Sequence, residues 1–216
     1  PPRSTLFPYT TLFRSGGVVV PTMNPLFTFI LAILIARRIP LQKEAIGLLL
    51  GLVGGALILK VWKFNFDELT TSGNSYFVIC SLSWAFLTVI TAKAKDYIPL
   101  LTFSFWTFSL AALLSFPFTV DSNVIEIFTY DWIFWLNFLL VTFGSMVFAT
   151  TVYFYGTVIL GSERASAFIF TVPLSALIFS MIFLREPLEI STVLGGILAM
   201  AAVYMINRKK RILPPT

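Results

Sequence analysis

The chain of 216 residues is 57% hydrophobic and 12% charged, with a net charge of +5. A soluble domain has about 45–50% apolar and about 25% charged residues, and a disordered chain is more polar still, so both classes are excluded. The absence of His and the single cysteine, Cys80, exclude an intrachain disulfide, a Cys/His metal site and a His-based triad. The basic residues do not cluster on one face, so no nucleic-acid partner is expected. This composition is typical of an integral membrane protein.

Residues 1–15 (PPRSTLFPYTTLFRS) have no helical period, three prolines and a repeated TLF. They resemble a translated reading frame of a common DNA-sequencing adapter, which accounts for residues 5–15. A secretory signal needs an apolar core of about 7–15 residues, which Pro8 and its polar neighbours interrupt. The alternatives are a disordered tail or a targeting segment. We predict a non-native, adapter-derived segment, without which the net charge falls by two, from +5 to +3.

Seven charge-free stretches of the remaining chain approach or exceed the length of about 20 residues that spans a bilayer. In chain order they are 16–36, 45–59, 75–92, 97–120, 132–160, 165–184 and 190–206. Lys43 and Lys60 flank the short second stretch and can extend it by snorkelling. The long fifth stretch is expected to tilt or to project beyond the bilayer. The sequence therefore predicts an all-α membrane protein with seven transmembrane helices.

The loop charges predict the orientation of these helices. With the C-terminus in the cytoplasm, ten Lys and Arg residues fall in inside loops, and the outside loops hold three, Lys60, Lys63 and Arg185. This asymmetry follows the positive-inside rule. We expect a multi-pass protein of the plasma membrane, or of the inner membrane if bacterial, with residues 208–216 as a cytoplasmic basic tail.

The sequence also matches itself at an offset of 148 residues. Pro25 then meets Pro173, Gly47 meets Gly195, and Gly51 meets Ala199. The matching spans lie five spans apart, so the two copies would have opposite orientations in the membrane. Inverted repeats around a site at the midplane are typical of secondary transporters.

The offset predicts the domain organisation. The intact protein would have ten helices in two inverted sets of five, the first of which lacks three helices upstream of residue 16. We expect residues 16–60 to form the last two helices of the first repeat. Residues 61–73 would be an external linker, and residues 74–207 a complete second repeat.

Three further motifs carry a family resemblance. The Pro-containing span ends in LREPL (184–188), a glycine-rich span follows from Gly195, and YFYG (153–156) leads to GSERAS (161–166). Over residues 16–211 the chain resembles the EamA-type family of the drug/metabolite transporter superfamily. That resemblance implies transport, with a central cavity among the spans that hold Asn24, Trp84, Tyr153 and Thr171. The chain departs from the family where the first copy has Arg38 opposite Glu186, so a matched pair of carboxylates is not expected.

Polar residues within the spans are the candidates for substrate binding, because an amide or hydroxyl group in hydrocarbon is costly unless it is hydrogen-bonded. The selected residues are Asn24, Ser83, Trp84, Tyr153 and Thr171. The wider set is Ser81, Asn137, Thr150, Thr151, Ser166, Ser175, Trp106 and Tyr155. The alternative for each is a hydrogen bond between helices.

Two other groups of residues have predicted mechanical roles. Pro25 and Pro173 each remove a helical hydrogen bond, so they are candidates for a hinge, with a simple packing kink as the alternative. Small residues spaced four apart let helices approach closely, which predicts helix packing at Gly47, Gly51, Gly55, Gly195 and Ala199.

No charged side chain lies in the middle of a span, which disfavours proton relays and phosphorylated substrates. We predict export of a small neutral, zwitterionic or amphipathic metabolite by alternating access, with no cofactor and no metal. The expected partners are the substrate and the lipid bilayer, and a homodimer is left open. The alternative function is a non-transporting scaffold or a seven-helix receptor. An enzyme is not expected, because no nucleophile–base pair is visible.

Overall fold

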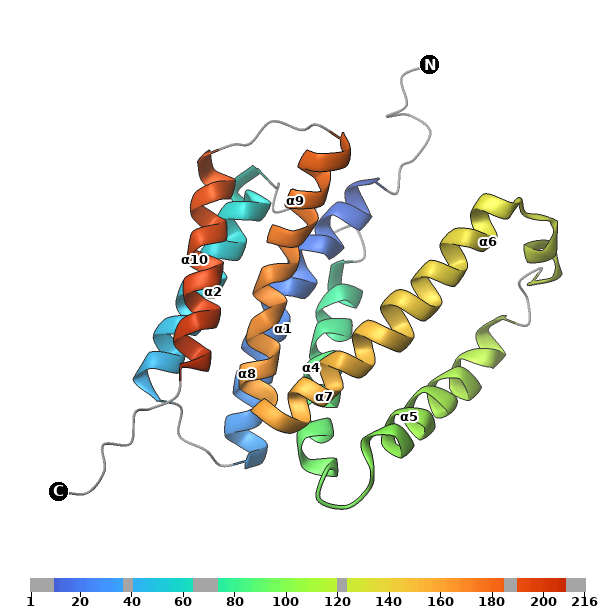
Figure 1. Cartoon of the computed structure of the whole chain (residues 1–216), viewed down its shortest axis with the longest axis horizontal. Helices are drawn as coiled ribbons and strands as arrows, with labels where there is room; N and C mark the ends of the chain where they lie inside the picture. Colours follow the sequence, from blue (N-terminus) through green and yellow to red (C-terminus); the bar gives the residue numbers. More distant parts are fainter. Residues whose placement is uncertain (1–9, 37–40, 64–73, 120–123, 185–189, 209–216) are drawn as a thin grey trace. The chain divides into compact units, whose positions relative to one another are not determined.

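The computed structural model describes residues 10–36, 41–63, 74–119, 124–184 and 190–208, and within these ranges all regular structure is helical (Figure 1). The chain divides into two compact units. Unit 1 comprises Pro1–Val89 and Ser162–Thr216, and unit 2 comprises Ile90–Gly161.

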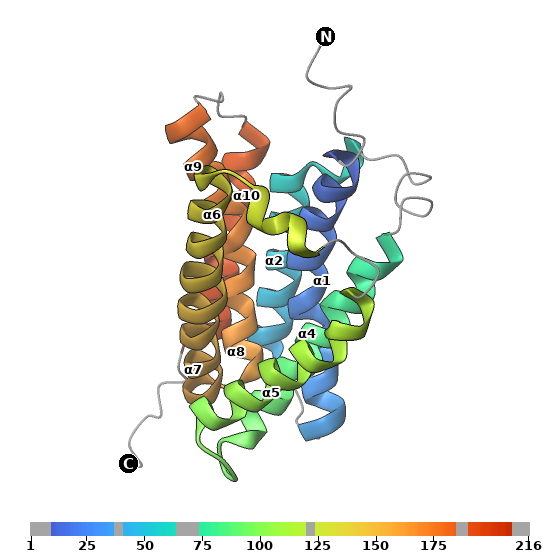
Figure 2. The same ribbon diagram turned by 90° about the vertical axis from the view of Figure 1, so that its right-hand side faces the viewer.

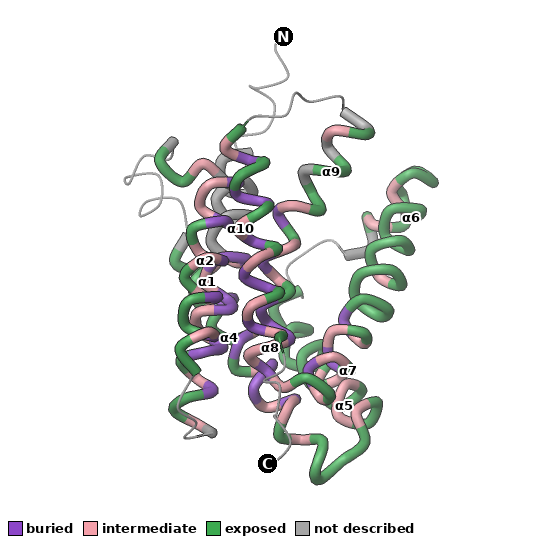
Figure 3. The backbone as a smooth tube through the Cα atoms, turned by 60° about the vertical axis from the view of Figure 1, so that its left-hand side comes forward, coloured by how far each residue is buried: buried purple, intermediate pink, exposed green. Residues whose placement is uncertain are grey.

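Unit 1 contains most of the buried side chains. Its elements are α1 (Thr10–Ala36), α2 (Gln42–Leu59), η2 (Val61–Lys63), most of α4 (Asn74–Ala94), α8 (Ser162–Ala167), η6 (Phe168–Thr171), α9 (Val172–Leu184) and α10 (Ile190–Asn207). Helix α1 begins inside the segment predicted to be adapter-derived. It packs against α2, α8, η6 and α9. Figure 3 shows the buried positions on α1, α2, α4, α8 and α10.

The most extensive helix contact among the described residues of unit 1 is between α2 and α10, which run antiparallel (Figure 1). A Cβ atom added at Gly54 would lie 2.7 Å from the backbone oxygen of Gly195, and one added at Gly195 would lie 2.6 Å from the backbone oxygen of Gly54. Real Cβ atoms essentially never approach so closely. These glycines therefore allow backbone-to-backbone contact that any larger residue would prevent.

The N-terminal end of α2 contains a buried acid. Glu44 is 1% exposed, and its Oε2 accepts a hydrogen bond of 3.0 Å from the backbone N–H of Leu41. This bond satisfies one of the backbone donors that a helix start leaves open. Nearby, Lys43 Nζ donates to the backbone oxygen of Arg208, which joins the start of α2 to the end of α10.

Unit 2 is an extended pair of helical rods. Its elements after α4 are α5 (Leu100–Ser115), η3 (Phe116–Thr119), η4 (Val124–Thr129), α6 (Trp132–Leu139), η5 (Leu140–Ala149) and α7 (Thr150–Leu160). Figure 2 shows α6, η5 and α7 as one continuous helix, in which η5 is π-helical. Asp131 caps its start by accepting from the backbone N–H of Phe134 at 2.9 Å. No residue of α5, α6 or η5 is buried.

Four helices of the described residues are long and apolar enough to cross a membrane. They are Ser75–Ala94, Leu100–Thr119, Trp132–Leu160 and Ile190–Asn207, and they coincide with four of the seven predicted spans. Residues Val20–Ile35 form a shorter apolar helix. The predicted span 165–184 is divided among α8, η6 and α9, and the span 45–59 lies within α2. The prediction of an all-helical fold is confirmed for the described residues, while the count of seven transmembrane helices remains a prediction.

Candidate functional site

Helix α1 carries two prolines one turn apart, Pro21 and Pro25, both of them buried. Neither has a backbone N–H, so the carbonyl groups of Gly17 and Pro21 lack their usual helical donors. Helix α1 therefore has two backbone carbonyl groups without an α-helical donor, close in sequence to the polar residues Thr22, Asn24 and Thr28.

Asn24 lies at this point and is fully buried, with 0% exposure. Its Nδ2 donates to the backbone oxygen of Ser81 on α4 at 3.2 Å, and Ser81 Oγ donates to the backbone oxygen of Val20 at 3.5 Å. Asn24 Oδ1 has no hydrogen-bond partner. The α1–α4 contact is thus an uncharged polar layer with one acceptor still available.

The neighbouring predicted residues of α4 lie differently. Ser83 is exposed and Trp84 is half-buried. Positions 81 and 83 are about 200° apart around an α-helix, so only one of them can face α1. The structure brings Ser81 to Asn24, and the sequence offered no signal that separates the two serines.

The second predicted kink lies where α8, η6 and α9 meet. Pro173, the second residue of α9, is buried, and the four residues of η6 before α9 form a 3₁₀ turn. Pro173 cannot donate to the backbone oxygen of Ile169, and the N–H of Val172 bonds that oxygen instead. A bond from residue i+3 to residue i is the pattern of a 3₁₀ helix. Thr171 is half-buried, and its Oγ1 donates to the backbone oxygen of Phe168 at 2.6 Å.

Phe170 anchors this turn. It is 1% exposed and clusters with Ile58 and Ala199. A Cβ atom added at Gly51 would lie 2.3 Å from the Phe170 ring, so the ring occupies the space that this glycine leaves. Gly55 faces α1 instead, since its added Cβ would lie 3.0 Å from Thr22 Cγ2.

Tyr153 belongs to unit 2. It is half-buried on α7, with its ring centroid 6.2 Å from that of Phe154. The other four selected residues, Asn24, Ser83, Trp84 and Thr171, belong to unit 1. Glu186 and Arg38 lie outside the described residues. Among the residues that the structure does describe, no group of three His, Cys, Asp or Glu side chains could hold a metal ion.

Comparison with known proteins identifies a family to which the chain is similar. The EamA-like transporter family matches residues 71–208, well over half of the chain. An uncharacterized transporter of Archaeoglobus fulgidus is 25% identical over 169 residues, covering 78% of this chain and 58% of its own length. The uncharacterized transporter YoaV of Bacillus subtilis is 27% identical over 193 residues, covering 88% of this chain and 64% of its own length.

A second protein of Bacillus subtilis, the uncharacterized transporter YvbV, is 27% identical over 187 residues, which is 54% of its own length. The chain thus spans less than two thirds of the length of these relatives. The apolar helices and the family match together agree with an integral membrane protein, and this chain belongs to the EamA-like transporter family.

Proposed function

We propose that this chain is part of a multi-pass transporter that exports a small neutral, zwitterionic or amphipathic metabolite by alternating access. The proposal also includes two inverted five-helix repeats, a location in the plasma membrane and a cytoplasmic C-terminus. The contact between α2 and α10 is the observation that carries it.

That contact has the form expected for two copies related by a two-fold axis. At the offset of 148 residues, Gly47 corresponds to Gly195 and Gly54 to Ala202. An added Cβ at Gly47 would lie 3.3 Å from the backbone oxygen of Ala202, and one at Gly195 would contact Gly54. Each contact is therefore the image of the other under exchange of the copies, as in an isologous interface.

A second pair of contacts follows the same rule. Ile206 corresponds to Ile58 by the offset. An added Cβ at Gly47 would lie 2.6 Å from Ile206 Cγ1, and one at Gly195 would lie 2.7 Å from Ile58 Cγ1. The antiparallel direction of α2 and α10 agrees with copies of opposite orientation, and rocking of one copy against the other gives alternating access.

The chemistry of the substrate follows from the Asn24 layer. A buried amide oxygen without a partner can accept a hydrogen bond from a substrate N–H or O–H group. The absence of a charged side chain from the middle of the predicted spans favours an uncharged or zwitterionic compound over a phosphorylated one.

Reconstitution into vesicles tests this function. A reading frame completed at its N-terminus is compared with the 216-residue chain, using radiolabelled neutral and zwitterionic metabolites, with sugar phosphates as the negative control. We expect the completed protein to transport at least one neutral compound and the 216-residue chain to transport none. Equal transport by the two proteins would contradict the ten-helix account, and transport of only sugar phosphates would contradict the substrate class.

A further inference from the structure

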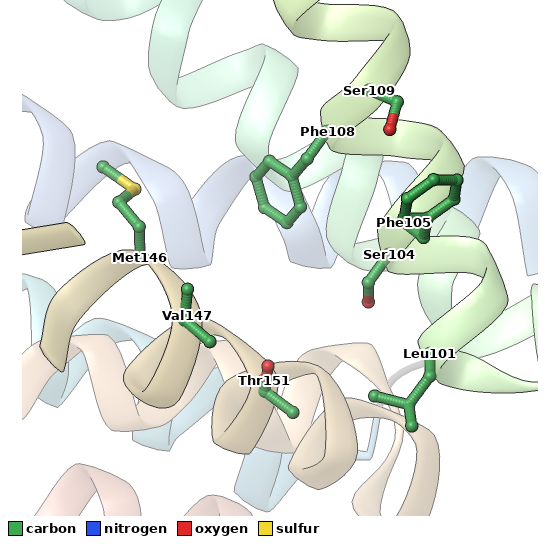
Figure 4. A pocket seen from close by; sticks show the side chains of 8 residues that line it. All are labelled: Leu101, Ser104, Phe105, Phe108, Ser109, Met146, Val147 and Thr151. Carbon is green, nitrogen blue, oxygen red and sulfur yellow. The ribbon is translucent and has the colours of Figure 1, made fainter. Parts of the chain in front are cut away.

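Unit 2 contains a cavity of about 520 Å³ between α5 and the junction of η5 with α7 (Figure 4). Its lining is Leu101, Ser104, Phe105, Phe108, Ser109, Met146, Val147 and Thr151. Cavities of about 300–1,000 Å³ with apolar walls and a few polar groups are typical of small-molecule sites. This cavity lies wholly within unit 2 and does not involve Asn24.

Ser104 is the unusual member of the lining. Its Oγ is buried and has no hydrogen-bond partner, and Figure 4 shows the hydroxyl group pointing into the cavity. Two other hydroxyl groups on these helices bond to their own backbone. Ser115 Oγ donates to the backbone oxygen of Ala111 at 2.8 Å, and Thr157 Oγ1 donates to that of Tyr153 at 2.9 Å. A buried donor without an acceptor is costly, so Ser104 is suited to an incoming acceptor.

The wall opposite Ser104 is formed at a π-helical segment. Met146 and Val147 belong to η5, and Thr151 follows in the first turn of α7. The backbone N–H of Thr150 bonds the oxygen of Ser145, five residues earlier. Such π-helical turns are rare and are frequent at functional sites. The cavity therefore lies where the helix departs from regular geometry.

We propose that this cavity binds an uncharged, largely aromatic or aliphatic molecule whose carbonyl oxygen accepts a hydrogen bond from Ser104 Oγ. The absence of a charged lining residue excludes an ionic ligand, because a buried charge needs a partner. The rings of Phe105 and Phe108 can pack against an aromatic or aliphatic ligand, and the Met146 thioether can make a favourable contact with an aromatic ring of the ligand.

Two sources can supply this chemistry, because both walls belong to helices long and apolar enough to span a bilayer. One source is the ester carbonyl and acyl chain of a phospholipid, and the other is a small carbonyl compound dissolved in the membrane. Ser104 is the fifth residue of the span Leu100–Thr119, about 6 Å from its end. Both a phospholipid ester carbonyl and a dissolved carbonyl compound can reach a hydroxyl group at that depth.

Benzophenone is a suitable probe, because it is uncharged, aromatic and photoreactive and carries one carbonyl group. The 216-residue chain in lipid nanodiscs is irradiated with increasing benzophenone, and modified residues are located by mass spectrometry. We expect saturable labelling of the cavity lining. Ser104→Ala should weaken it about threefold to tenfold, the value of one lost hydrogen bond. Ser115→Ala, on the same helix, should leave it unchanged.

Nanodiscs of ester-linked and ether-linked phosphatidylcholine distinguish the two sources. Weaker labelling in the ester-linked lipid identifies the phospholipid ester as the competitor, and equal labelling identifies a dissolved solute; either result supports the site. Thermal unfolding without the probe supplies the second readout. Ser104→Ala should unfold at the same or a higher temperature, because it removes an unpaired buried hydroxyl. Absence of labelling in the cavity, labelling unchanged in Ser104→Ala, or a lower unfolding temperature for this variant would overturn the proposal.

Discussion

The amide of Asn24 keeps an unpaired oxygen in a fully buried position between α1 and α4. A buried polar atom without a partner costs about 1–3 kcal/mol. Replacement by Leu, whose side chain has the same branching and number of heavy atoms, removes this cost together with the bond to the Ser81 carbonyl. We expect Asn24→Leu to keep or raise the unfolding temperature in detergent. The same variant of the completed protein should lose at least about tenfold in transport, the equivalent of one strong hydrogen bond.

Thr28→Val is the matched control for Asn24→Leu. Thr28 is also fully buried on α1, but its Oγ1 bonds within the helix, to the backbone oxygen of Asn24 at 2.9 Å. This variant should transport at close to the wild-type rate. If Asn24→Leu lowers the unfolding temperature as well as the transport rate, the Asn24 amide has a structural role only.

Gly51 offers a test of packing around the η6 turn. A methyl group at this position would lie 2.3 Å from the ring of Phe170, which is itself buried against Ile58 and Ala199. Overpacking of a filled core costs about 1–3 kcal/mol. We expect Gly51→Ala to lower the free energy of unfolding by this amount in a denaturant titration.

Gly156→Ala is the control for Gly51→Ala, since nothing lies within 4 Å of its added Cβ. It should be neutral or stabilising by up to about 1 kcal/mol, through helix propensity alone. Combining Gly51→Ala with Phe170→Leu should restore part of the loss. A loss that is equal for the two alanine variants would refute the ring contact as its cause.

At the residue scale, the sequence predicted types of contact better than partners. The four-residue spacing of Gly47 and Gly51 predicted close helix packing but contains no information on which helix approaches. Their neighbours, Ile206 and Ala202 for Gly47 and Phe170 for Gly51, depend on the fold of the whole unit. Ser81 and Ser83 are chemically identical, so only the rotation of α4 distinguishes the residue that contacts Asn24.

At the scale of elements, we expect the missing N–H of Pro173 to maintain the turn η6. Pro173 has no N–H, and the carbonyl of Ile169 accepts from Val172 instead. Pro173→Ala supplies a new amide at position 173, which can restore the α-helical bond to Ile169. We expect this amide to be protected in hydrogen exchange, and transport by the completed protein to slow with little change in KM, because a hinge is lost while binding contacts remain.

Pro21→Ala is a useful comparison for Pro173→Ala, because the helix around Pro21 is already α-helical. Its new amide should be protected without a change in the neighbouring exchange rates. An unprotected amide in Pro173→Ala would mean that Phe170 packing, instead of the missing N–H, maintains η6.

The π-helical geometry of η5 could not be predicted from the sequence. The stretch 132–160 was predicted as one long span, and the structure has one helical span, Trp132–Leu160. As an α-helix, its 29 residues would be about 44 Å long, against a hydrocarbon core of about 30 Å. A π-helix places more residues in each turn, which shortens the rod. The bonds between residues i and i+5 have no distinctive pattern of residue types. The sequence therefore predicted that the span is longer than the bilayer needs, but it did not predict that a π-helix shortens it.

At the scale of the whole molecule, composition and loop charges carry the prediction of orientation. Residues 93–96 are predicted to lie inside the cell and residues 121–131 outside, with the span Leu100–Thr119 between them. Asp96 and Phe128 are both exposed. Replacing either leaves every Lys and Arg in place, so the charge asymmetry that sets orientation is unchanged.

Single-cysteine variants convert this prediction into a side-specific measurement. In a Cys80→Ser background, Phe128→Cys should react with a membrane-impermeant maleimide in intact cells. Asp96→Cys should react only after permeabilisation, because the bilayer separates it from the reagent. The chain with Cys80→Ser alone is the blank. Reaction of both variants in intact cells would mean that the span between them does not cross the membrane, and the reverse pattern would invert the proposed orientation and place the basic tail outside.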